Sequence, residues 1–478
     1  MRAWSVLAVI AAVAAACRGD ARPNGTTAPP SSVATALQVE SANAATRVDS
    51  IDPRRRTLLT DAVAKVSPAV VTVQTEVVQN APVDPFDAFF GGGGGGQRVL
   101  QGLGTGFIVR SDGVIVTNAH VVNDAKTISV ALRDGTPYRA RLVGKDETND
   151  IAVLKIDAKD LPVAQLGNSD SLLIGEWAIA IGNPYGFYLG NSEPSVTTGV
   201  ISGTGRNLAS PNEGSATYVD MIQTDAAINH GNSGGPLVDA VGEVIGMNSS
   251  IFSPSGGSVG LGFAIPINRV KRVMEDLLLH GVVRQPWLGI RLVLPETSSP
   301  LGALRFGVNV RAVVPGSPAA AAGIKAGDTI VRAGSRVLHN PFDWEAEKLD
   351  LRVGERVQLT VKRGEREFPV TVTVASLPDE SAPKVQVLKE LELVTVTPAI
   401  RAERGIRSSH GALIYQVSPR VADDLGIAKG DVIVQINQLP IENAQDVQKA
   451  LNALAGRSVI HMYFERGGQI YTTDFMVR

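Results

Sequence analysis

The stretch Gly231-Asn232-Ser233-Gly234-Gly235-Pro236-Leu237 places a serine between glycines and closes with a proline and a leucine. Glycine and proline interrupt helices and strands, so this pattern predicts a tight loop. Glycines also let backbone amides approach one hydroxyl closely, as an acyl-transfer site requires for its oxyanion. The alternative is an ordinary surface turn. The choice depends on whether the chain also supplies a base and a carboxylate.

Length and composition limit the classes of protein that fit. At about 150 residues per domain, 478 residues predict about three domains. A hydrophobic content of 44% with 19% charged residues is typical of a globular protein. The net charge of -2 gives no basis for electrostatic binding of nucleic acid, so no such partner is expected. Cys17 is the sole cysteine, which excludes a disulfide framework within the chain, and we expect no metal site and no cofactor.

The first residues predict export from the cytoplasm. An apolar run from Trp4 to Ala16 follows Arg2 and is too short for a comfortable transmembrane helix, so residues 1–17 are interpreted as a signal peptide. Ala14-Ala15-Ala16 fits a signal peptidase site, whereas the same residues with Cys17 resemble a bacterial lipobox that lacks its usual leucine. We favour lipidation of Cys17, which would be the one contact with a membrane. Residues 18–57 lack apolar periodicity and predict a flexible tether.

Residues 58–281 consist of short β-rich runs, such as Ile151–Ile156, separated by glycine-containing turns. This pattern predicts an antiparallel sandwich or barrel, and the length favours two packed barrels over one. Residues 268–280 carry apolar side chains at helical spacing and precede Gly281, which predicts a closing helix. The segment 85–96 ends in six glycines without the Gly-Lys-Ser/Thr of a phosphate loop, so it predicts no nucleotide site.

The C-terminal part contains an internal repeat. Gly323-Ile324-Lys325-Ala326-Gly327-Asp328 recurs as Gly426-Ile427-Ala428-Lys429-Gly430-Asp431, an offset of 426 − 323 = 103 residues. A period of this length indicates a duplicated domain rather than a solenoid. The expected boundaries are 283–376 and 386–478, with a linker over 377–385.

Two residues far upstream of the serine complete a possible catalytic set. His120 lies at the end of one predicted strand and Asp150 at the beginning of another. Either residue alone is more often structural. The order His120, Asp150, Ser233 within one β-rich domain is that of the double-barrel serine proteases.

Residues 60–478 resemble the HtrA (Deg) family, which are trypsin-fold serine proteases with C-terminal PDZ domains. The motifs that carry the resemblance are Gly102–Phe107, Thr117–Val121, Asn149–Leu154, Gly182–Gly186, Gln223–Asn229 and Gly262–Pro266. The resemblance implies a mainly β chain: a trypsin-like double β-barrel protease domain followed by two PDZ domains. The segment 85–96 resembles the long regulatory loop of this family, which takes part in oligomer contacts.

The resemblance also assigns roles. Ser233 would attack the scissile carbonyl, His120 would take and return its proton, and Asp150 would orient the imidazole. The amides of Gly231 and Ser233 would form the oxyanion hole. His230 is a rival base, but it is badly placed in the loop of the nucleophile itself.

Substrate specificity is expected to depend on Ala227 and Ile251. In this fold the residue six positions before the nucleophile lines the primary pocket, and Ala227 offers no acid to pair with Lys or Arg. Ile251 resembles the position that narrows the pocket. These two residues predict cleavage after small or medium aliphatic residues.

The two repeats are the expected peptide-binding modules. Trp287-Leu288-Gly289-Ile290 resembles a PDZ carboxylate loop, in which glycine permits close approach of the amides. The second repeat has Leu391-Glu392-Leu393 there, and the acid in place of glycine argues against carboxylate binding. A fragment 283–376 should therefore bind C-terminal peptides well, and a fragment 386–478 weakly.

The expected function is that of an exported, ATP-independent serine endopeptidase of the periplasm or cell envelope. By resemblance, its partners would be unfolded or mislocalised polypeptides, C-terminal peptides and other copies of itself, as a trimer or a multiple of trimers. One alternative is a chaperone or adaptor that binds unfolded proteins more than it cleaves them. Another is a signalling protease with one regulatory substrate.

Overall fold

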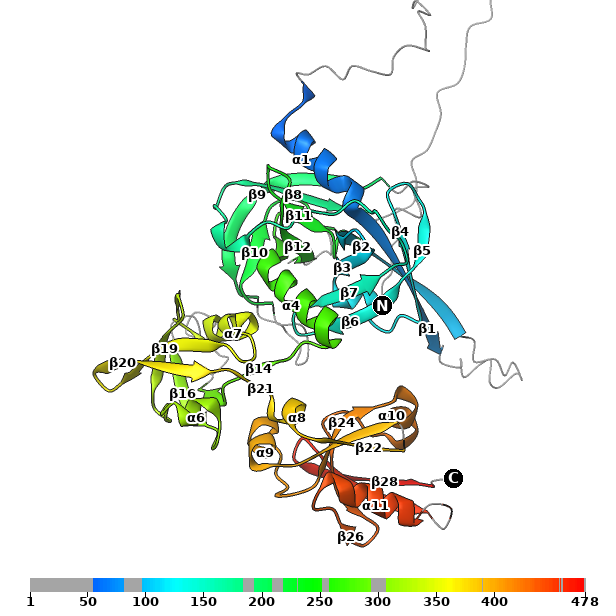
Figure 1. Ribbon diagram of the computed structural model, residues 1–478, viewed down its shortest axis with the longest axis vertical. Coiled ribbons are helices and arrows are strands. Elements are labelled where there is room, and N and C mark those ends of the chain that lie inside the picture. The colour runs from blue at the N-terminus through cyan, green and yellow to red at the C-terminus, as the bar shows by residue number, and fades with distance from the viewer. Residues whose placement is uncertain are drawn as a thin grey trace, which may run out of the picture. The chain divides into compact units, whose positions relative to one another are not determined.

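The computed structural model describes residues 55–80, 97–183, 193–208, 218–229, 231–251, 258–293, 307–388, 390–454, 456 and 459–476. The predicted signal peptide with Cys17, nearly all of the predicted tether, the segment 85–96 and His230 lie outside these residues. Strands dominate the described part of the chain (Figure 1).

A helix and a seven-stranded antiparallel sheet form the first half of the N-terminal β region. Helix α1 (Leu58–Val66) begins after Thr57, whose side chain accepts a hydrogen bond from the Thr60 amide in a capping box. The described strands follow the order β5-β4-β1-β2-β3-β7-β6. Their bounds are β1 (Val70–Asn80), β2 (Gln97–Arg110), β3 (Val114–Thr117), β4 (Thr127–Ala131), β5 (Pro137–Arg139), β6 (Arg141–Asp146) and β7 (Ile151–Lys155).

The second half is a closed barrel with the strand order β10-β13-β12-β11-β8-β9. Its strands are β8 (Trp177–Gly182), β9 (Ser195–Arg206), β10 (Met221–Thr224), β11 (Pro236–Val238), β12 (Val244–Ile251) and β13 (Gly262–Pro266). One closed barrel and one sheet that does not close among the described residues thus correspond to the two predicted barrels. The predicted closing helix is α4 (Ile267–His280), which ends at Gly281 with φ 74°.

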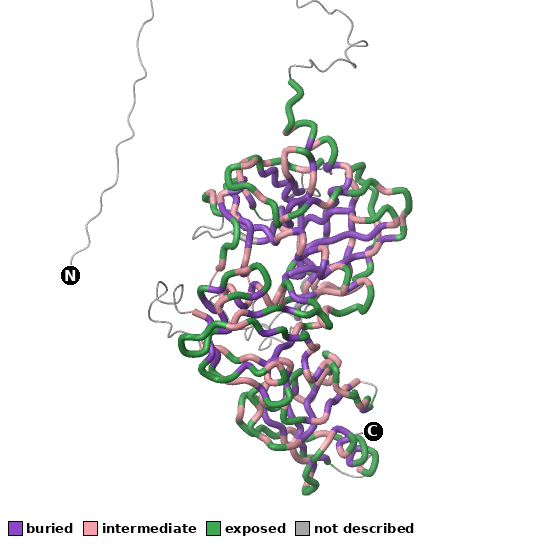
Figure 2. The backbone as a smooth tube through the Cα atoms, turned by 60° about the vertical axis from the view of Figure 1, so that its left-hand side comes forward, coloured by how far each residue is buried: buried purple, intermediate pink, exposed green. Residues whose placement is uncertain are grey.

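Buried aliphatic side chains fill both halves. Phe107, Ile115, Ile151 and Leu154 from the sheet share one core with Val270 of α4, all with 0% exposed surface. Figure 2 shows this interior as a continuous run of buried residues through the strands. A rigid framework is therefore in place behind the loops at the strand ends.

The first repeat contains, among its described residues, a six-stranded antiparallel sheet and the helices α6 and α7. The sheet order is β15-β16-β17-β19-β20, with β18 paired to β17. The elements are β14 (Pro286–Trp287), β15 (Ile290–Leu292), β16 (Val308–Val313), α6 (Pro318–Ala321), β17 (Thr329–Ala333), β18 (Arg336–Val337), α7 (Pro341–Asp350), β19 (Arg356–Arg363), β20 (Arg366–Thr373) and β21 (Ala375–Ser376).

The second repeat has the same plan with one more strand, in the order β22-β23-β24-β25-β27-β28 with β26 paired to β25. Its elements are α8 (Pro378–Ser381), β22 (Lys384–Val387), β23 (Leu391–Thr395), α9 (Pro398–Arg404), β24 (Ala412–Val417), α10 (Pro419–Leu425), β25 (Val432–Ile436), β26 (Leu439–Pro440), α11 (Ala444–Leu454), β27 (Ile460–Arg466) and β28 (Gln469–Phe475).

One ion pair recurs in both repeats and explains their shared motif. Asp328 of the first Gly-Asp motif pairs with Arg363 at 2.6 Å, and Asp431 of the second pairs with Arg466 at 2.6 Å. Both partners keep the predicted offset, because 431 − 328 and 466 − 363 are each 103. In both repeats the arginine also donates to the carbonyl of the glycine that opens the motif. The motif therefore ties a helix end to the strand that carries the arginine.

Candidate active site

Two neighbouring strands of the first sheet bring His120 and Asp150 together. His120 lies on the short helix α3 (Ala119–Val122), directly after β3, and Asp150 directly precedes β7. Strands β3 and β7 pair antiparallel with Thr117 opposite Ala152, so the end of one strand lies beside the start of the other. Asp150 has φ 56°, a left-handed conformation that an aspartate tolerates better than most residues.

The carboxylate of Asp150 is buried and contacts both the backbone amide and the imidazole of His120. The His120 backbone amide donates to Oδ1 at 3.0 Å, and Nδ1 lies 2.8 Å from Oδ2. The Asp150 side chain is 3% exposed whereas the imidazole is 44% exposed. An imidazole fixed through Nδ1 on a buried carboxylate keeps Nε2 available to accept a proton from solvent-side groups.

Ser249 links this pair to Ser233, the proposed nucleophile. Its hydroxyl donates to Asp150 Oδ2 at 2.9 Å, and its carbonyl accepts a hydrogen bond from Ser233 Oγ at 3.1 Å. Ser249 of β12 thereby contacts two of the three residues proposed from the sequence, and His120 is connected to it through Asp150. Among the described residues no hydrogen bond joins Ser233 Oγ to His120, so proton transfer between them requires a movement of one of the two side chains.

The nucleophile loop is fixed against β2 of the first sheet. The Thr105 amide donates to the Ser233 carbonyl at 2.9 Å, and the Thr105 hydroxyl donates to the Gly231 carbonyl at 2.5 Å. Gly234 has φ 83°, and a Cβ added there would lie 2.2 Å from the Thr105 carbonyl oxygen. A glycine is therefore required at this position for both its backbone conformation and the close approach of β2.

The backbone amides of the loop separate into two groups. Those of Asn232, Gly234 and Gly235 donate to the carbonyls of Asn229, Asn248 and Asn232. Among the residues that the structure describes, no acceptor is present for the amides of Gly231 and Ser233. These are the two amides that the resemblance to the HtrA family implies as donors of the oxyanion hole.

The two residues proposed for specificity lie on the closed barrel. Ala227 is half-buried after β10, and its carbonyl accepts a hydrogen bond from Thr197 Oγ1 at 2.7 Å. Ile251 ends β12 opposite Gly262 of β13. Ala227 therefore lies three residues after the end of β10, and Ile251 is the last residue of β12.

Several residues around the site were missed by sequence reasoning. Thr105 belongs to the motif Gly102–Phe107, but no role was predicted for it from the sequence. No role was predicted for Ser249 or Tyr218 either. The pKa of the Tyr218 phenol is raised, first by burial and then by the negative charge of Asp150, while a hydrogen bond with Ser249 opposes the shift. No local pattern marks Ser249, because its contact with Asp150 joins residues 99 positions apart.

Comparison with known families agrees with this geometry. Residues 104–247 match the model of the trypsin-like peptidase domain, and residues 286–374 and 393–464 each match a PDZ domain. A probable periplasmic serine endoprotease, DegP-like, of Pseudomonas savastanoi pv. phaseolicola is 38% identical over 392 residues, 79% of each chain. The chain belongs to the DegP/HtrA family of serine endoproteases. The first and second repeats are accordingly its first and second PDZ domains, and the predicted fold class is confirmed.

Other relatives support the same assignment. A DegP-like endoprotease of a Marinomonas species is 37% identical over 432 residues, covering 84% of this chain and 89% of that protein. Among solved structures, the HtrA-type protease AlgW with a decapeptide is 37% identical, with a TM-score of 0.51, covering 68% of this chain and 99% of that one. AlgW with a tripeptide matches at the same identity and TM-score.

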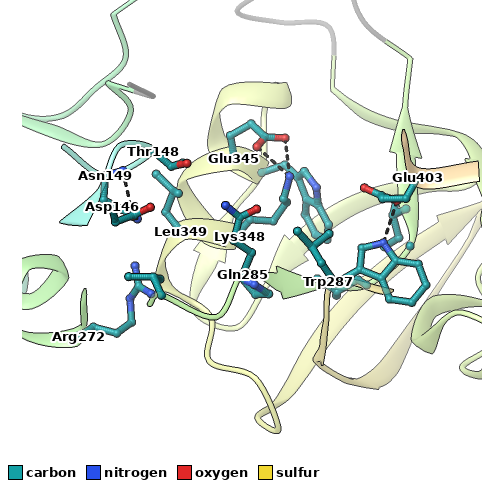
Figure 3. A pocket seen from close by; sticks show the side chains of 17 residues that line it. Asp146, Thr148, Asn149, Arg272, Gln285, Trp287, Glu345, Lys348, Leu349 and Glu403 are labelled. Carbon is teal, nitrogen blue, oxygen red and sulfur yellow. Dashed lines mark hydrogen bonds and ion pairs between the residues drawn. The ribbon is translucent and has the colours of Figure 1, made fainter. Parts of the chain in front are cut away.

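The carboxylate loop of the first PDZ domain of this DegP/HtrA chain borders a small cavity of about 170 Å³ (Figure 3). Gly289 has φ 76°, and a Cβ there would lie 2.2 Å from Ser317 Cβ, so the loop requires glycine. Lys348 and Glu345 of α7 lie beside the cavity and pair at 2.9 Å. Trp287 lies beside it as well, with its indole directed at Glu403 of the second PDZ domain. The four predicted loop residues thus share one site.

Two further features concern cofactors and membranes. Within the described residues, no group of three or more His, Cys, Asp or Glu side chains is arranged to hold a metal ion. Across that same part of the protein, every helix is too short or too polar to span a lipid bilayer.

Proposed function

We propose that this protease is a periplasmic, ATP-independent endopeptidase that degrades unfolded or mislocalised proteins and is controlled by peptides bound to its first PDZ domain. The observation that carries the catalytic part is the set of contacts from His120 through Asp150 and Ser249 to Ser233. The periplasmic location rests on relatives that are described as periplasmic endoproteases, and the substrate class rests on the family resemblance.

The contacts support a specific sequence of steps. Ser233 Oγ attacks the scissile carbonyl while His120 takes its proton, and the oxyanion of the tetrahedral intermediate accepts hydrogen bonds from the amides of Gly231 and Ser233. His120 then returns the proton to the leaving amine, which leaves an acyl-enzyme on Ser233. Water activated by His120 hydrolyses this ester. Buried Asp150 stabilises the imidazolium in both steps.

The primary pocket supports cleavage after small or medium aliphatic residues. The two sequence neighbours of Ala227, Ala226 and Ile228, are both apolar and buried. A lysine or arginine entering beside Ala227 would lose water without gaining a carboxylate, which is costly.

Contacts between the first PDZ domain and the protease domain support control by peptide. Arg336 of β18 pairs with Asp220 at 2.9 Å. Asp220 lies two residues after Tyr218, whose phenol is close enough to Ser249 and Asp150 for both to affect its pKa. A shift of the PDZ domain therefore has a short physical route to the catalytic carboxylate. The solved AlgW relatives carry peptides, which agrees with such a role.

Assembly and anchoring complete the proposal. The family resemblance supports a homo-oligomer, a trimer or a multiple of trimers, and the signal sequence with Cys17 supports a lipid anchor. Mass photometry measures the oligomeric state. Metabolic labelling of wild type and Cys17→Ala with a palmitate analogue tests the lipid anchor.

The proposed enzyme is tested by digesting reduced casein with wild type and Ser233→Ala, and by labelling with a fluorophosphonate probe. Wild type should cleave and label, the variant should do neither, and a hydrophobic C-terminal peptide should increase the labelling rate. Binding of casein without cleavage by either protein would favour the chaperone or adaptor alternative. Cleavage restricted to one native protein would favour the signalling protease.

A further inference from the structure

The two PDZ domains differ at the sheet edge where a peptide would add. In the first domain, β15 is the edge strand of the sheet among the residues that the structure describes. In the second domain the equivalent strand is β23. Strands β17 and β25 correspond at the offset of 103 residues, and the order β15-β16-β17 in the first sheet matches β23-β24-β25 in the second. Strand β23 is not an edge, because β22 pairs with its outer side.

The groove of the first domain is open. A cavity of about 540 Å³ lies between β15 and helix α7 and is lined by Ile290 and Leu292 on the strand and by Trp344 and Glu345 on the helix. An extended peptide placed there would pair with the side of β15 to which no described strand is bonded, the binding mode of PDZ domains.

In the second domain the corresponding space holds β22. Its antiparallel register runs from Lys384 opposite Val394 to Val387 opposite Leu391. A peptide whose C-terminus lies in the loop before β23 must run in this same direction. Val387 therefore occupies the place that the last residue of a bound peptide would take.

The side chains of β22 alternate between buried and exposed, as those of a bound peptide strand would. Val387 is 2% exposed and belongs to one hydrophobic core with Val447 and Leu451 of α11. Val385 packs partly against the same core, whereas Lys384 and Gln386 are exposed, as the alternation of a strand requires. The Gln448 side chain of α11 also donates to the Gln386 carbonyl at 3.2 Å.

We propose that Lys384–Val387 is a built-in ligand of the second PDZ domain and keeps this domain from binding C-terminal peptides. The chain continues from Val387 into a turn that starts at Leu388 with φ 53°, so the place of a free carboxylate is taken by the main chain. A strand joined by so short a turn competes at an effective concentration of the order of millimolar or higher. Each chain then has one peptide site, on the first domain.

Hydrogen exchange on the full chain tests this inference directly. The probe is a peptide that ends in Val-Gln-Val with a free carboxylate, a copy of residues 385–387. Amides of 391–395 should be protected without the probe and unchanged by it, whereas those of 290–292 should gain protection. Fast exchange in 391–395 that slows on addition of the probe would overturn the inference.

A disulfide lock provides a second test. Gln386→Cys with Glu392→Cys joins directly opposed residues of β22 and β23, and Glu392→Cys with Gln416→Cys joins β23 to β24 as the matched control, both in a Cys17→Ser background. Both pairs should oxidise, and isothermal titration calorimetry should still give one bound probe per chain. A drop from two probes to one on locking β22 would refute the inference.

These tests separate this inference from the proposed function, on which its regulatory meaning rests. If the wild-type chain binds no probe at all, control by peptide at the first PDZ domain fails. Protection of 391–395 and oxidation of the Gln386→Cys, Glu392→Cys pair still decide whether β22 fills the groove of the second domain.

Discussion

The indole Nε1 of Trp287 donates a hydrogen bond to Glu403 Oε2 at 2.8 Å, which joins the carboxylate loop of the first PDZ domain to helix α9 of the second. Trp287 is 8% exposed and packs with Val314 and Leu377. Its ring also lies 3.2 Å from the position of a Cβ on Gly289. The second domain thus supports the shape of the loop that is proposed to bind peptides.

Removing this support should weaken peptide binding. Glu403→Ala removes the acceptor for a nearly buried donor, at a cost of about 1–2 kcal/mol, or about 5- to 30-fold in Kd for a C-terminal peptide. Fluorescence anisotropy on the full chain measures it. Glu403→Gln keeps a side-chain oxygen as the acceptor and should recover most of the affinity. Equal affinities for wild type and Glu403→Ala would contradict the role of α9.

Ser249 should act as a positioning residue for the catalytic carboxylate. Ser249→Ala deletes one charge-assisted hydrogen bond to Asp150, and we expect kcat/KM to fall by about 10- to 100-fold. The acidic limb of the pH–rate profile should also move, because Asp150 stabilises the imidazolium that forms on His120. Ser249→Thr keeps the hydroxyl and serves as the control. Identical profiles for the Ala and Thr variants would remove Ser249 from this role.

Gly234→Ala should disable the nucleophile loop and destabilise the protease domain. The left-handed backbone and the close approach of Thr105 together predict a loss of about 2–5 kcal/mol. Gly260→Ala is the matched control, because Gly260 has φ 80° but nothing lies within 4 Å of an added Cβ. Calorimetry and fluorophosphonate labelling of both variants give the comparison. The prediction fails if the two variants lose the same stability and both still label.

Ala227→Asp should change the residue preferred before the scissile bond. A carboxylate at this pocket position would pair with lysine or arginine and remove their desolvation cost, so a peptide library should show a gain of at least about tenfold for basic residues. Ala227→Asn has nearly the same volume without the charge and should not show this gain. A wild-type enzyme that already prefers lysine or arginine would overturn the proposed specificity.

The pair Asp328–Arg363 should make the first PDZ domain sensitive to acid. Hydrogen bonds from Arg363 lower the pKa of Asp328, against the opposing effect of burial. Because the pKa is lower in the folded than in the unfolded state, the pair stabilises the fold above the ordinary carboxyl pKa, and this stabilisation is lost as pH falls through the folded value.

Replacing the partner should therefore shift acid unfolding of this domain to higher pH. Arg363→Gln leaves the buried Asp328 carboxylate without its cation, whereas Arg366→Gln removes a neighbouring arginine near the Phe368 ring and serves as the control. Circular dichroism and calorimetry between about pH 7 and about pH 3 follow the transition. Equal midpoints for the two variants would show that the pair does not stabilise the domain.

Features that depend on local sequence could be predicted. The helix before Gly281 and the repeat with its 103-residue offset each have a short, self-contained pattern, and the structure has both. His120, Asp150 and Ser233 could be proposed because each belongs to its own motif, and their order completed the argument. In the structure, Ser249 contacts Asp150 and Ser233, and His120 is connected to it through Asp150.

Features that depend on distant contacts could not be predicted. The hydroxyl of Thr105 reaches Gly231 across 126 positions, and nothing near Thr105 in the sequence marks that contact. Strand β22 could not be predicted for a different reason. Four residues of alternating polarity are too few to distinguish from a linker, so the expected boundary at residue 386 falls within the strand Lys384–Val387.

The proposed catalytic residues come from two separately built halves, since His120 and Asp150 belong to the seven-stranded sheet and Ser233 to the closed barrel. Thr105 and Ser249 supply hydrogen bonds that cross this seam. A small displacement between the halves would change the distance between Ser233 and His120 while every strand stayed intact. On heating, proteolysis should therefore cease at a lower temperature than the loss of β structure, and cooling should restore it.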